Sequence, residues 1–522
     1  MPRPNIVMIL ADDLGYSDLA AFGGEIDTPN LDRLAARGTR MSSFYVTPRC
    51  SPSRAALLTG RHPHSVGIGI LTRDDRPNGY RGALQPGIPT IADRLGEQGY
   101  TTGLIGKWHL SSDRTEPNDT WPLRRGFGEF YGMLGGCGSY YQPVLTDGDS
   151  TVSADAMADP GYYITDDLSS RAVDFIDRNA GAESPFFLYL AYTAPHWPLH
   201  AREEDIAKYR ERFLAGWDDL RVARFRRQVE LGIHNMAELP PRDERVPAWG
   251  ASDDQAWEAE RMAVYAAQVE AMDRGIGAVL DALEAAGVAD DTLVIFSSDN
   301  GACAEDLGDL MAGPGLPAEM CPPLTRGVKT VRVGNDPSIA PGPEEGYASY
   351  GRSWANLSNT PFRQYKRWVH EGGIASSMIA SWPAGGIVEG ALTATPGHVI
   401  DIAPTMLAAI GAVDDTAAGE SLLPTLRGEV PTHERTMYWE HIGNAAIRRG
   451  PWKLVREDNG PWELYDIESD RAESIDLVAT RPRFVAELVE EWSTWAQANG
   501  VLPWEDVVAD YRERGIENQV RG

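Results

Sequence analysis

Cysteine is scarce in this chain. Only four of its 522 residues are cysteines, at positions 50, 137, 303 and 321. So few thiols exclude a disulfide framework as the means of holding together a chain of this length. Cys303 and Cys321 flank one loop and could pair with each other, but two free thiols are the simpler interpretation.

Basic residues and long apolar runs are also lacking. Lys and Arg number 48 against 76 Asp and Glu, which gives a formal net charge of −28 at pH 7. This charge argues against nucleic-acid or anionic-membrane partners, because both need a basic surface. No apolar run is long enough to span a bilayer. The N-terminal segment MPRPNIVMILADD enters a strand-like run at once and has no small-residue cleavage site, so we expect a cytoplasmic protein without a signal peptide.

The chain is rich in short apolar, β-branched runs that alternate with helical patterns. Its length favours two domains, and its 42% hydrophobic content is ordinary for a globular protein. The alternation predicts an α/β fold whose large, mostly parallel sheet is flanked by helices. The predicted strands are 5–11, 100–106, 185–192, 291–298 and 375–382, and the predicted helices are 28–38, 90–99 and 263–287.

Three regions depart from this alternation. Residues 200–260 are polar and residues 302–356 are rich in Gly and Pro, and we expect both to be irregular insertions near a site entrance. From about residue 435, short alternating stretches separated by turn residues predict a small antiparallel sheet, followed by one helix over 482–500. The predicted domains are therefore 1–430 and 431–522.

Two of the predicted strands end in carboxylates. Asp12 and Asp13 follow the first strand, and Asp299 and Asn300 follow the strand over 291–298. Ligands collect at the carboxyl ends of strands in open α/β sheets. Taken singly, each pair is explained as a helix or turn cap. Together their oxygens predict a site for Ca²⁺ or Mg²⁺, and not for Zn²⁺, which prefers nitrogen and sulfur ligands.

Cys50 begins the segment CSPSRAALLTG. Pro52 suits a first helical turn and Gly60 a helix end, so Cys50 is predicted at a helix N-terminus with Arg54 one turn further on. Four interpretations compete: a buried structural thiol, a thiolate nucleophile, a metal ligand, or the precursor of another group. A soft thiolate is a poor match for a site of hard oxygen ligands.

Cationic and imidazole side chains follow several predicted strands. Lys107 and His109 come after 100–106, His196 comes after 185–192, and Lys366 precedes 375–382. Each has an ordinary reading as a surface lysine or a hydrogen-bonded loop histidine. With Arg54 and a divalent cation, they would form the positive pocket that an anionic substrate needs in so acidic a chain. Such a pocket fits a tetrahedral sulfate or phosphate ester.

These residues resemble a known family. CSPSRAALLTG matches the C-x-P-x-R signature followed by L-T-G of the type I, formylglycine-dependent sulfatases. The stretches ADDLG, GKWHL, APHWP, SDNG and FRQYKRWVHEGG are similar to further sulfatase blocks, in the family's order. The resemblance is closest to the bacterial arylsulfatases and implies the fold of the alkaline phosphatase superfamily, with a smaller C-terminal antiparallel sheet and helix.

The resemblance also implies a cofactor and a maturation partner. Cys50 would be oxidised to formylglycine by a formylglycine-generating or equivalent enzyme, and its hydrate would be the nucleophile. Ca²⁺, or Mg²⁺ as in some relatives, would be the bound metal. Its ligands would be Asp12, Asp13, Asp299, Asn300 and the modified Cys50.

By the same resemblance the remaining site residues have roles in hydrolysis. Arg54 and Lys107 would hold the hydrated aldehyde, with Asp299 as the base. Lys107, His196 and Lys366 would bind the sulfate, and His196 would donate a proton to the leaving group. His109 would take a proton when sulfate is expelled.

The function expected is hydrolysis of sulfate monoesters of phenols or small alcohols to the free alcohol and inorganic sulfate. One alternative is a phosphonate monoester or phosphodiester hydrolase of the same superfamily, because the same nucleophile and metal serve both reactions. A second alternative is a non-catalytic Ca²⁺-binding protein on this fold, in which Cys50 would remain a thiol.

Overall fold

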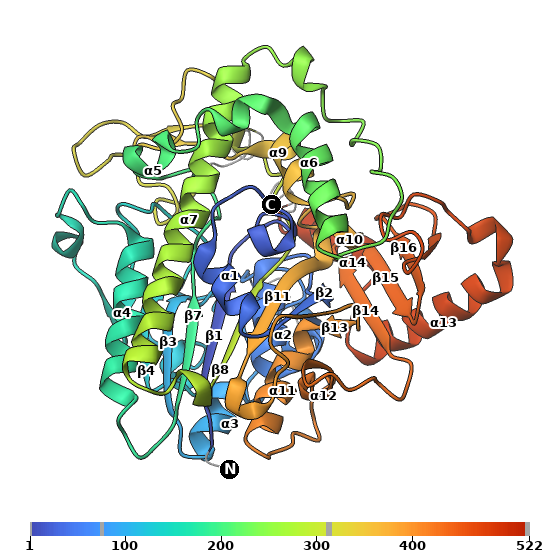
Figure 1. The fold of residues 1–522 in the computed structure, drawn as a ribbon, viewed down its shortest axis with the longest axis horizontal. Coiled ribbons are helices and arrows are strands. Elements are labelled where there is room, and N and C mark those ends of the chain that lie inside the picture. Colours follow the sequence, from blue (N-terminus) through green and yellow to red (C-terminus); the bar gives the residue numbers. More distant parts are fainter. Residues whose placement is uncertain (1–2, 74–77, 309–315, 517–522) are drawn as a thin grey trace.

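A large sheet forms the centre of the protein. The computed structural model describes residues 3–73, 78–308 and 316–516. Strands in the sheet follow the order β12-β2-β11-β8-β1-β7-β3-β4-β5-β6, and β13 pairs with β2 (Figure 1). Their bounds are β1 Asn5–Ala11, β2 Thr39–Tyr45, β3 Thr101–Lys107, β4 Glu129–Met133, β5 Thr146–Asp147, β6 Ser150–Thr151, β7 Phe186–Ala191, β8 Thr292–Ser298, β11 Ala375–Ser381, β12 Ala391–Thr393 and β13 Gly397–His398.

The middle of this sheet is parallel. β8, β1, β7, β3 and β4 run in one direction, whereas β11 is antiparallel to both β8 and β2. The five predicted strands are confirmed as β1, β3, β7, β8 and β11. The carboxyl ends of β1, β3, β7 and β8 therefore meet at one edge, where the predicted site residues begin.

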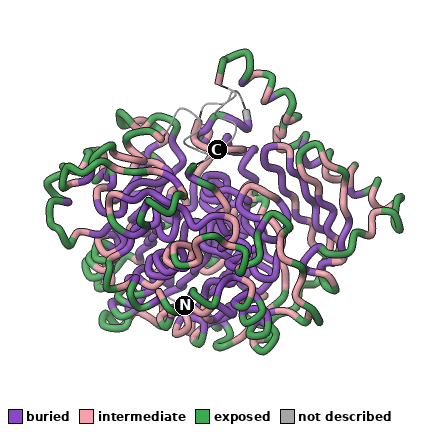
Figure 2. Tube along the Cα trace, turned by 90° about the horizontal axis from the view of Figure 1, so that it is seen from above, coloured by how far each residue is buried: buried purple, intermediate pink, exposed green. Residues whose placement is uncertain are grey.

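Both faces of the sheet are covered, as the unbroken apolar runs predict. Along β1, Val7 and Ile9 point into one hydrophobic cluster, and Ile6 and Met8 point into another. The first cluster includes residues of α1 (Pro29–Ala36), α4 (Ile164–Asn179) and α7 (Gln255–Ala285); the second includes residues of α2 (Cys50–Thr59), α3 (Ile91–Glu97) and α11 (Ile402–Ala409). Figure 2 shows the buried residues concentrated in the interior and the exposed residues around the outside.

Residues 200–260 are helical for much of their length, so their predicted irregularity was wrong. They contain α5 (Glu203–Ala207), α6 (Gly216–Glu230) and the first turns of α7, which begins where the Asp254 carboxylate accepts a hydrogen bond from the Trp257 N–H at 3.0 Å. Helix α6 is polar, yet Arg224 within it is buried and its guanidinium pairs with Asp18 and Glu25. Buried arginines of this kind hide the apolar face that sequence periodicity relies on.

The described part of residues 302–356 has little regular structure, as predicted. It contains β9 (Arg332–Val333), β10 (Gly346–Tyr347) and α9 (Gly351–Ser358), and residues 309–315 lie outside the described residues. Cys303 is buried in this segment, and the Glu305 carboxylate reaches the centre described below.

The C-terminal part contains the predicted antiparallel sheet and helix. Strands β14 (Thr436–His441), β15 (Asn444–Arg449), β16 (Trp452–Arg456) and β17 (Glu463–Asp466) pair in sequence order beside the main sheet (Figure 1). Leu488 of α13 (Pro482–Ala498) packs against Ile447, Leu454 and Leu464. A further helix, α14 (Trp504–Glu513), was not predicted. The division at 430/431 stays a prediction. In the described residues, no helix is both long and apolar enough to cross a membrane.

A buried ion-pair cluster joins the C-terminal sheet to the main domain. The Lys453 Nζ on β16 lies 2.8 Å from Glu371 Oε1 and 2.9 Å from Glu473 Oε1, and all three side chains are fully buried. The Tyr45 hydroxyl on β2 donates to Glu371 Oε2 at 2.8 Å. Glu371 is five residues after Lys366, so the cluster anchors the segment that carries a predicted substrate-binding lysine.

Candidate active site

The predicted site residues converge at the carboxyl edge of the parallel strands. Most lie at a strand end, on the loop that follows it, or on a helix that packs there; Lys366 lies on a loop between two helices, and all are buried. They are Asp12 and Asp13 after β1, Cys50 and Arg54 on α2, Lys107 and His109 at the end of β3, His196 after β7, Asp299 and Asn300 after β8, and Lys366 before α10 (Glu371–Ile374).

Three carboxylates and an amide form the acidic part of the site. Asn300 Nδ2 donates to Asp13 Oδ1 at 2.7 Å, and the Asp13 N–H donates to Asp299 Oδ1 at 3.3 Å. Asp13 adopts a φ of 66°, in the left-handed region that a side chain other than glycine rarely adopts. Strain of this kind is common where a loop must direct a side chain into a site.

The donor set fits a hard divalent cation. Asp12 Oδ1 and Asn300 Oδ1 are buried and have no hydrogen-bond partner in the described part of the chain. Buried polar atoms are nearly always paired, so two orphaned oxygens in one cluster indicate that a further group belongs there. Carboxylate and amide oxygens are the ligands that Ca²⁺ and Mg²⁺ take in proteins. One oxygen of Asp12, one of Asp299 and the Cys50 sulfur also lie within 4.8 Å of one another.

The carboxylates titrate differently because of their surroundings. Burial and the charge of Asp12 raise the pKa of Asp299 to about 6. Burial also acts to raise the pKa of Asp13, but the charges of Lys366 and His196 outweigh it and hold that pKa below its usual range. Crowding of like charges and close cationic partners produce such opposite shifts.

Cys50 is the first residue of α2. Its Sγ lies 3.4 Å from His109 Nδ1, and α2 ends at Gly60, which has a φ of 65°. Burial raises the pKa of the Cys50 thiol, although Lys107 and Lys366 oppose the shift. A neutral buried thiol is a weak nucleophile, so the thiolate interpretation of Cys50 loses support.

Arg54 and Lys107 pair with the carboxylates of the site. The Arg54 Nε and Nη2 donate to Asp299 Oδ2 at 3.0 and 2.8 Å, and its Nη1 donates to the Lys107 carbonyl at 2.9 Å. The Lys107 Nζ lies 2.6 Å from Asp12 Oδ2. Because all of these groups are fully buried, their charges act in a medium of low dielectric constant, where attraction is strong.

Asn300 contacts Oδ1 of Asp13, whereas Lys366 and His196 lie near Oδ2. The Lys366 Nζ lies 2.8 Å from Asp13 Oδ2 and 3.4 Å from His196 Nε2. The His196 Nδ1 is 2.7 Å from the Trp197 carbonyl and must donate its hydrogen there, so in the neutral ring Nε2 carries no hydrogen and can accept one from the Lys366 ammonium. Burial lowers the pKa of His196 to about 4, although Asp13 opposes the shift. The His196 imidazole is therefore neutral at pH 7 when no anion is bound beside it.

His109 is fixed in an unusual conformation. It has a φ of 53°, and a Cβ at Gly136 would lie 2.7 Å from its imidazole ring, so glycine at position 136 leaves room for that ring. Burial, followed by the charge of Lys107, lowers the pKa of His109 well below its usual value. His109 is therefore neutral at pH 7 and able to accept a proton.

Three residues of this centre were not predicted: Arg49, Trp197 and Glu305. Glu305 Oε1 lies 2.8 Å from Arg49 Nη1, and its Oε2 accepts a hydrogen bond from Trp197 Nε1 at 2.8 Å. Glu305 Oε2 also lies 3.9 Å from the Lys366 Nζ. The only signals were adjacency, because Arg49 precedes Cys50, Trp197 follows His196, and Glu305 comes six residues after Asp299.

Comparison with known proteins identifies the family. The sequence model of the sulfatase family matches residues 4–412, most of the chain. The chain belongs to the sulfatase family. An uncharacterised sulfatase of Schizosaccharomyces pombe is 32% identical over 96% of this chain and 94% of its own length. An arylsulfatase of Klebsiella aerogenes is 33% identical over 77% of this chain and 86% of its own length.

Solved structures agree with this assignment. The structure of Ps i-CgsB in complex with k-i-k-neocarrahexaose has a TM-score of 0.70 and 27% identity, with both chains fully covered. The PsFucS1 sulfatase of Pseudoalteromonas has a TM-score of 0.61 over 98% of this chain and 91% of its own, and at 21% identity it supports the fold alone. The predicted alkaline phosphatase-like fold is confirmed, and this sulfatase is a sulfuric ester hydrolase.

The other thiols of this sulfatase are unpaired. Cys137, Cys303 and Cys321 are all free, so the alternative in which Cys303 pairs with Cys321 is wrong for this structure. Burial raises the pKa of Cys137 and of Cys303, which keeps both thiols neutral.

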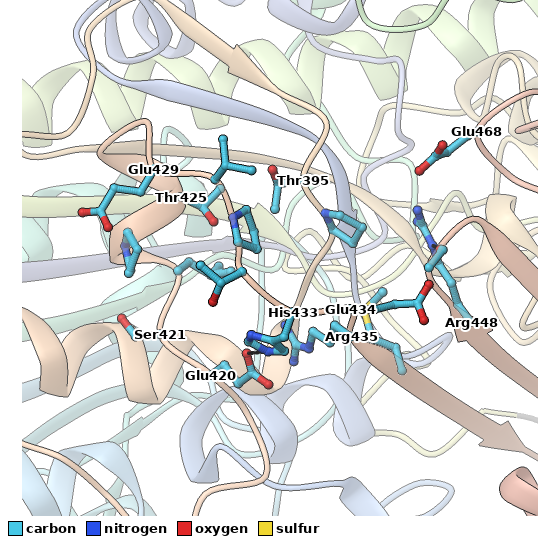
Figure 3. A pocket seen from close by; sticks show the side chains of 18 residues that line it. Thr395, Glu420, Ser421, Thr425, Glu429, His433, Glu434, Arg435, Arg448 and Glu468 are labelled. Carbon is cyan, nitrogen blue, oxygen red and sulfur yellow. Dashed lines mark hydrogen bonds and ion pairs between the residues drawn. The ribbon is translucent and has the colours of Figure 1, made fainter.

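The sulfatase also has a cavity outside this centre. It has a volume of about 420 Å³ and lies between the segments around Thr395, Glu420–Arg435 and Arg448 (Figure 3). Glu420, Glu429, Glu434 and Glu468 line it, and none of the predicted site residues does. The cavity therefore does not belong to the active site.

Proposed function

We propose that this sulfatase hydrolyses sulfate monoesters with a formylglycine derived from Cys50 and a divalent cation, Ca²⁺ or Mg²⁺, held by Asp12, Asp13, Asp299 and Asn300. The observation that carries the proposal is the buried cluster around Cys50, in which three cationic side chains face carboxylates. Within it Asp12 Oδ1 and the amide Oδ1 of Asn300 have no hydrogen-bond partner among the described residues. Conversion of Cys50 needs an oxidising maturation enzyme as a partner.

The divalent cation and the formylglycine would supply the reactive chemistry. A bound cation polarises oxygen atoms, and a hydrated aldehyde supplies a hydroxyl nucleophile together with a second hydroxyl through which the enzyme is later freed. Arg54 and Lys107, fixed by Asp299 and Asp12, would orient the side chain at position 50. The neutral His109, 3.4 Å from Cys50 Sγ, is placed to accept a proton from that side chain.

Lys366 and His196 are proposed to bind the sulfate group. The Lys366 Nζ, and the His196 Nε2 once the imidazole is charged, would face charge that develops on the ester, and a single such donor is worth about 2.7–4 kcal/mol in the transition state. Because Nδ1 of His196 is engaged with the Trp197 carbonyl, proton donation from Nε2 requires the charged imidazolium. A bound sulfate next to His196 favours that charged form.

Aryl sulfates and sugar sulfates are the substrates to test first. The Klebsiella relative is named an arylsulfatase, which agrees with the aryl or small alkyl esters expected from the sequence. The Ps i-CgsB structure was determined with k-i-k-neocarrahexaose, an oligosaccharide, which adds sugar sulfates to the proposed class.

A matched pair of substrates tests the proposal against its nearest alternative. Para-nitrophenyl sulfate and para-nitrophenyl phenylphosphonate have the same leaving group and differ in the atom that is attacked. We expect kcat/KM for the sulfate ester to exceed that for the phosphonate. A far higher kcat/KM for the phosphonate would overturn sulfate esters as the principal substrates.

Divalent-cation binding gives a second prediction. Adding Ca²⁺ to chelator-treated enzyme should raise the free energy of unfolding by about 2.7 kcal/mol at one hundred times the dissociation constant, because the cation binds only the folded site. Denaturant unfolding with and without Ca²⁺ measures this gain. Asp12→Asn should reduce it strongly, and the exposed control Asp415→Asn should not. An equal gain in all three proteins would show that Ca²⁺ binds elsewhere.

A further inference from the structure

Arg367 lies immediately beside the active site, one residue after Lys366. It has a φ of 93°, in the left-handed region, and its N–H donates to the Pro48 carbonyl at 2.7 Å. Pro48 directly precedes Arg49 and Cys50. The strained backbone at Arg367 therefore joins the segment that carries Lys366 to the segment that leads into α2.

The Arg367 guanidinium has no carboxylate partner among residues 3–73, 78–308 and 316–516. It is half-buried, and burial followed by the charge of Arg49 lowers its pKa. Arg49 itself is buried and paired with Glu305. Because Glu305 is paired with Arg49, no ion pair among the described residues compensates the charge of the neighbouring Arg367.

Arg245, which lies near the same tryptophan, provides a comparison for Arg367. The guanidinium carbons of Arg245 and Arg367 each lie 5.7 Å from the centre of the Trp368 ring. Arg245 is paired with Asp243 at 2.8 Å, whereas Arg367 is not paired. The two arginines thus share an aromatic neighbour but only Arg367 has a guanidinium available to a ligand.

The C-terminal sheet does not neutralise this charge at close range. Asn444 Nδ2 donates to the Arg367 carbonyl at 3.4 Å. His441 is buried nearby, and burial together with the charges of Arg49 and Arg367 lowers its pKa well below its usual value. Asp458, the remaining acidic influence on Arg367 besides Glu305, is exposed to solvent and forms no ion pair with it.

We propose that Arg367, with Arg49 beside it, forms a second anion-binding site next to the sulfate-binding group, so that the preferred substrates are sulfate esters bearing another anionic group, a sulfate or a carboxylate. This inference rests on the proposed function, because the second anion is defined relative to an ester bound at Cys50. A guanidinium presents a planar set of donors that matches the oxygens of both anions. Its partial burial strengthens that attraction relative to a fully exposed charge.

Substituted phenyl sulfates test the proposal. Ortho-, meta- and para-carboxyphenyl sulfate place the second anion at three positions. Each is compared with its carboxamide, which has a similar size and no charge. For at least one position we expect kcat/KM of the carboxylate to be about tenfold higher than that of the carboxamide, mainly through a lower KM. A doubly sulfated sugar against its monosulfated form tests sulfate as the second anion. Added salt should reduce the preference.

Variants assign the preference to Arg367. Arg367→Ala should remove it, Arg367→Lys should retain part of it, and the matched control Arg245→Ala should leave it unchanged. The anion site is overturned if wild type shows no preference for either second anion, if the preference survives Arg367→Ala, or if Arg245→Ala removes it equally. Failure of wild type to hydrolyse para-nitrophenyl sulfate would instead refute the proposed function, and this inference with it.

Discussion

Cys50→Ala is expected to lower kcat for para-nitrophenyl sulfate on the order of 10⁴-fold or more, because it removes the atom from which the proposed nucleophile is made. The fold should persist, since Cys50 contributes a small side chain at the start of α2 and no disulfide. Steady-state kinetics measure the loss, and circular dichroism checks the fold.

The control for Cys50→Ala is Cys321→Ala, which removes a half-buried free thiol that no part of the proposed site contacts. Its kcat should stay within about twofold of wild type. If Cys50→Ala retained comparable activity, position 50 would not supply the nucleophile and the proposed reaction would be wrong.

Lys453→Met is expected to lower the free energy of unfolding by about 3–5 kcal/mol, because Glu473 would be left as a buried carboxylate without its ion-pair partner and Glu371 would be left with the more distant Arg471, at 3.6 Å. Methionine keeps most of the side-chain volume, so the effect reports the charge. Denaturant unfolding followed by intrinsic fluorescence measures the loss.

Lys208→Met is the matched control for Lys453→Met. Lys208 pairs with Glu270 at 2.5 Å, but 44% of its side chain is exposed, and such surface pairs contribute about 0–1 kcal/mol. Equal losses in the two variants would mean that the buried cluster does not stabilise the join between the C-terminal sheet and the main domain.

The sequence predicted the helices and strands whose pattern is visible within one short stretch of residues. β1, β7 and β8 are buried on both faces, and each contains an unbroken apolar run: IVMILA, FFLYLA and LVIF. β2 and β4 escaped prediction because TRMSSFY is interrupted by small polar residues and EFYGM is short and contains glycine. The polar α6 was missed because buried arginines occupy part of its inner face.

In the candidate site too, some residues were predictable from the local sequence and others were not. Asp12, Asp299 and Lys107 follow recognisable strands, and Cys50 begins a specific motif, so local sequence placed them near one edge of the sheet. Glu305 gave no such signal, because its partners Arg49 and Trp197 are more than 100 residues away along the chain. Contacts made only by the folded loops cannot be read from local composition.

The identity of the side chain at position 50 is the central claim. Mass spectrometry of the peptide spanning residues 47–61, from active enzyme made together with its maturation partner, tests it most directly. We predict that Cys50 has lost its sulfur and two hydrogens and gained one oxygen, the change from cysteine to formylglycine. An unmodified cysteine in fully active enzyme would contradict the account.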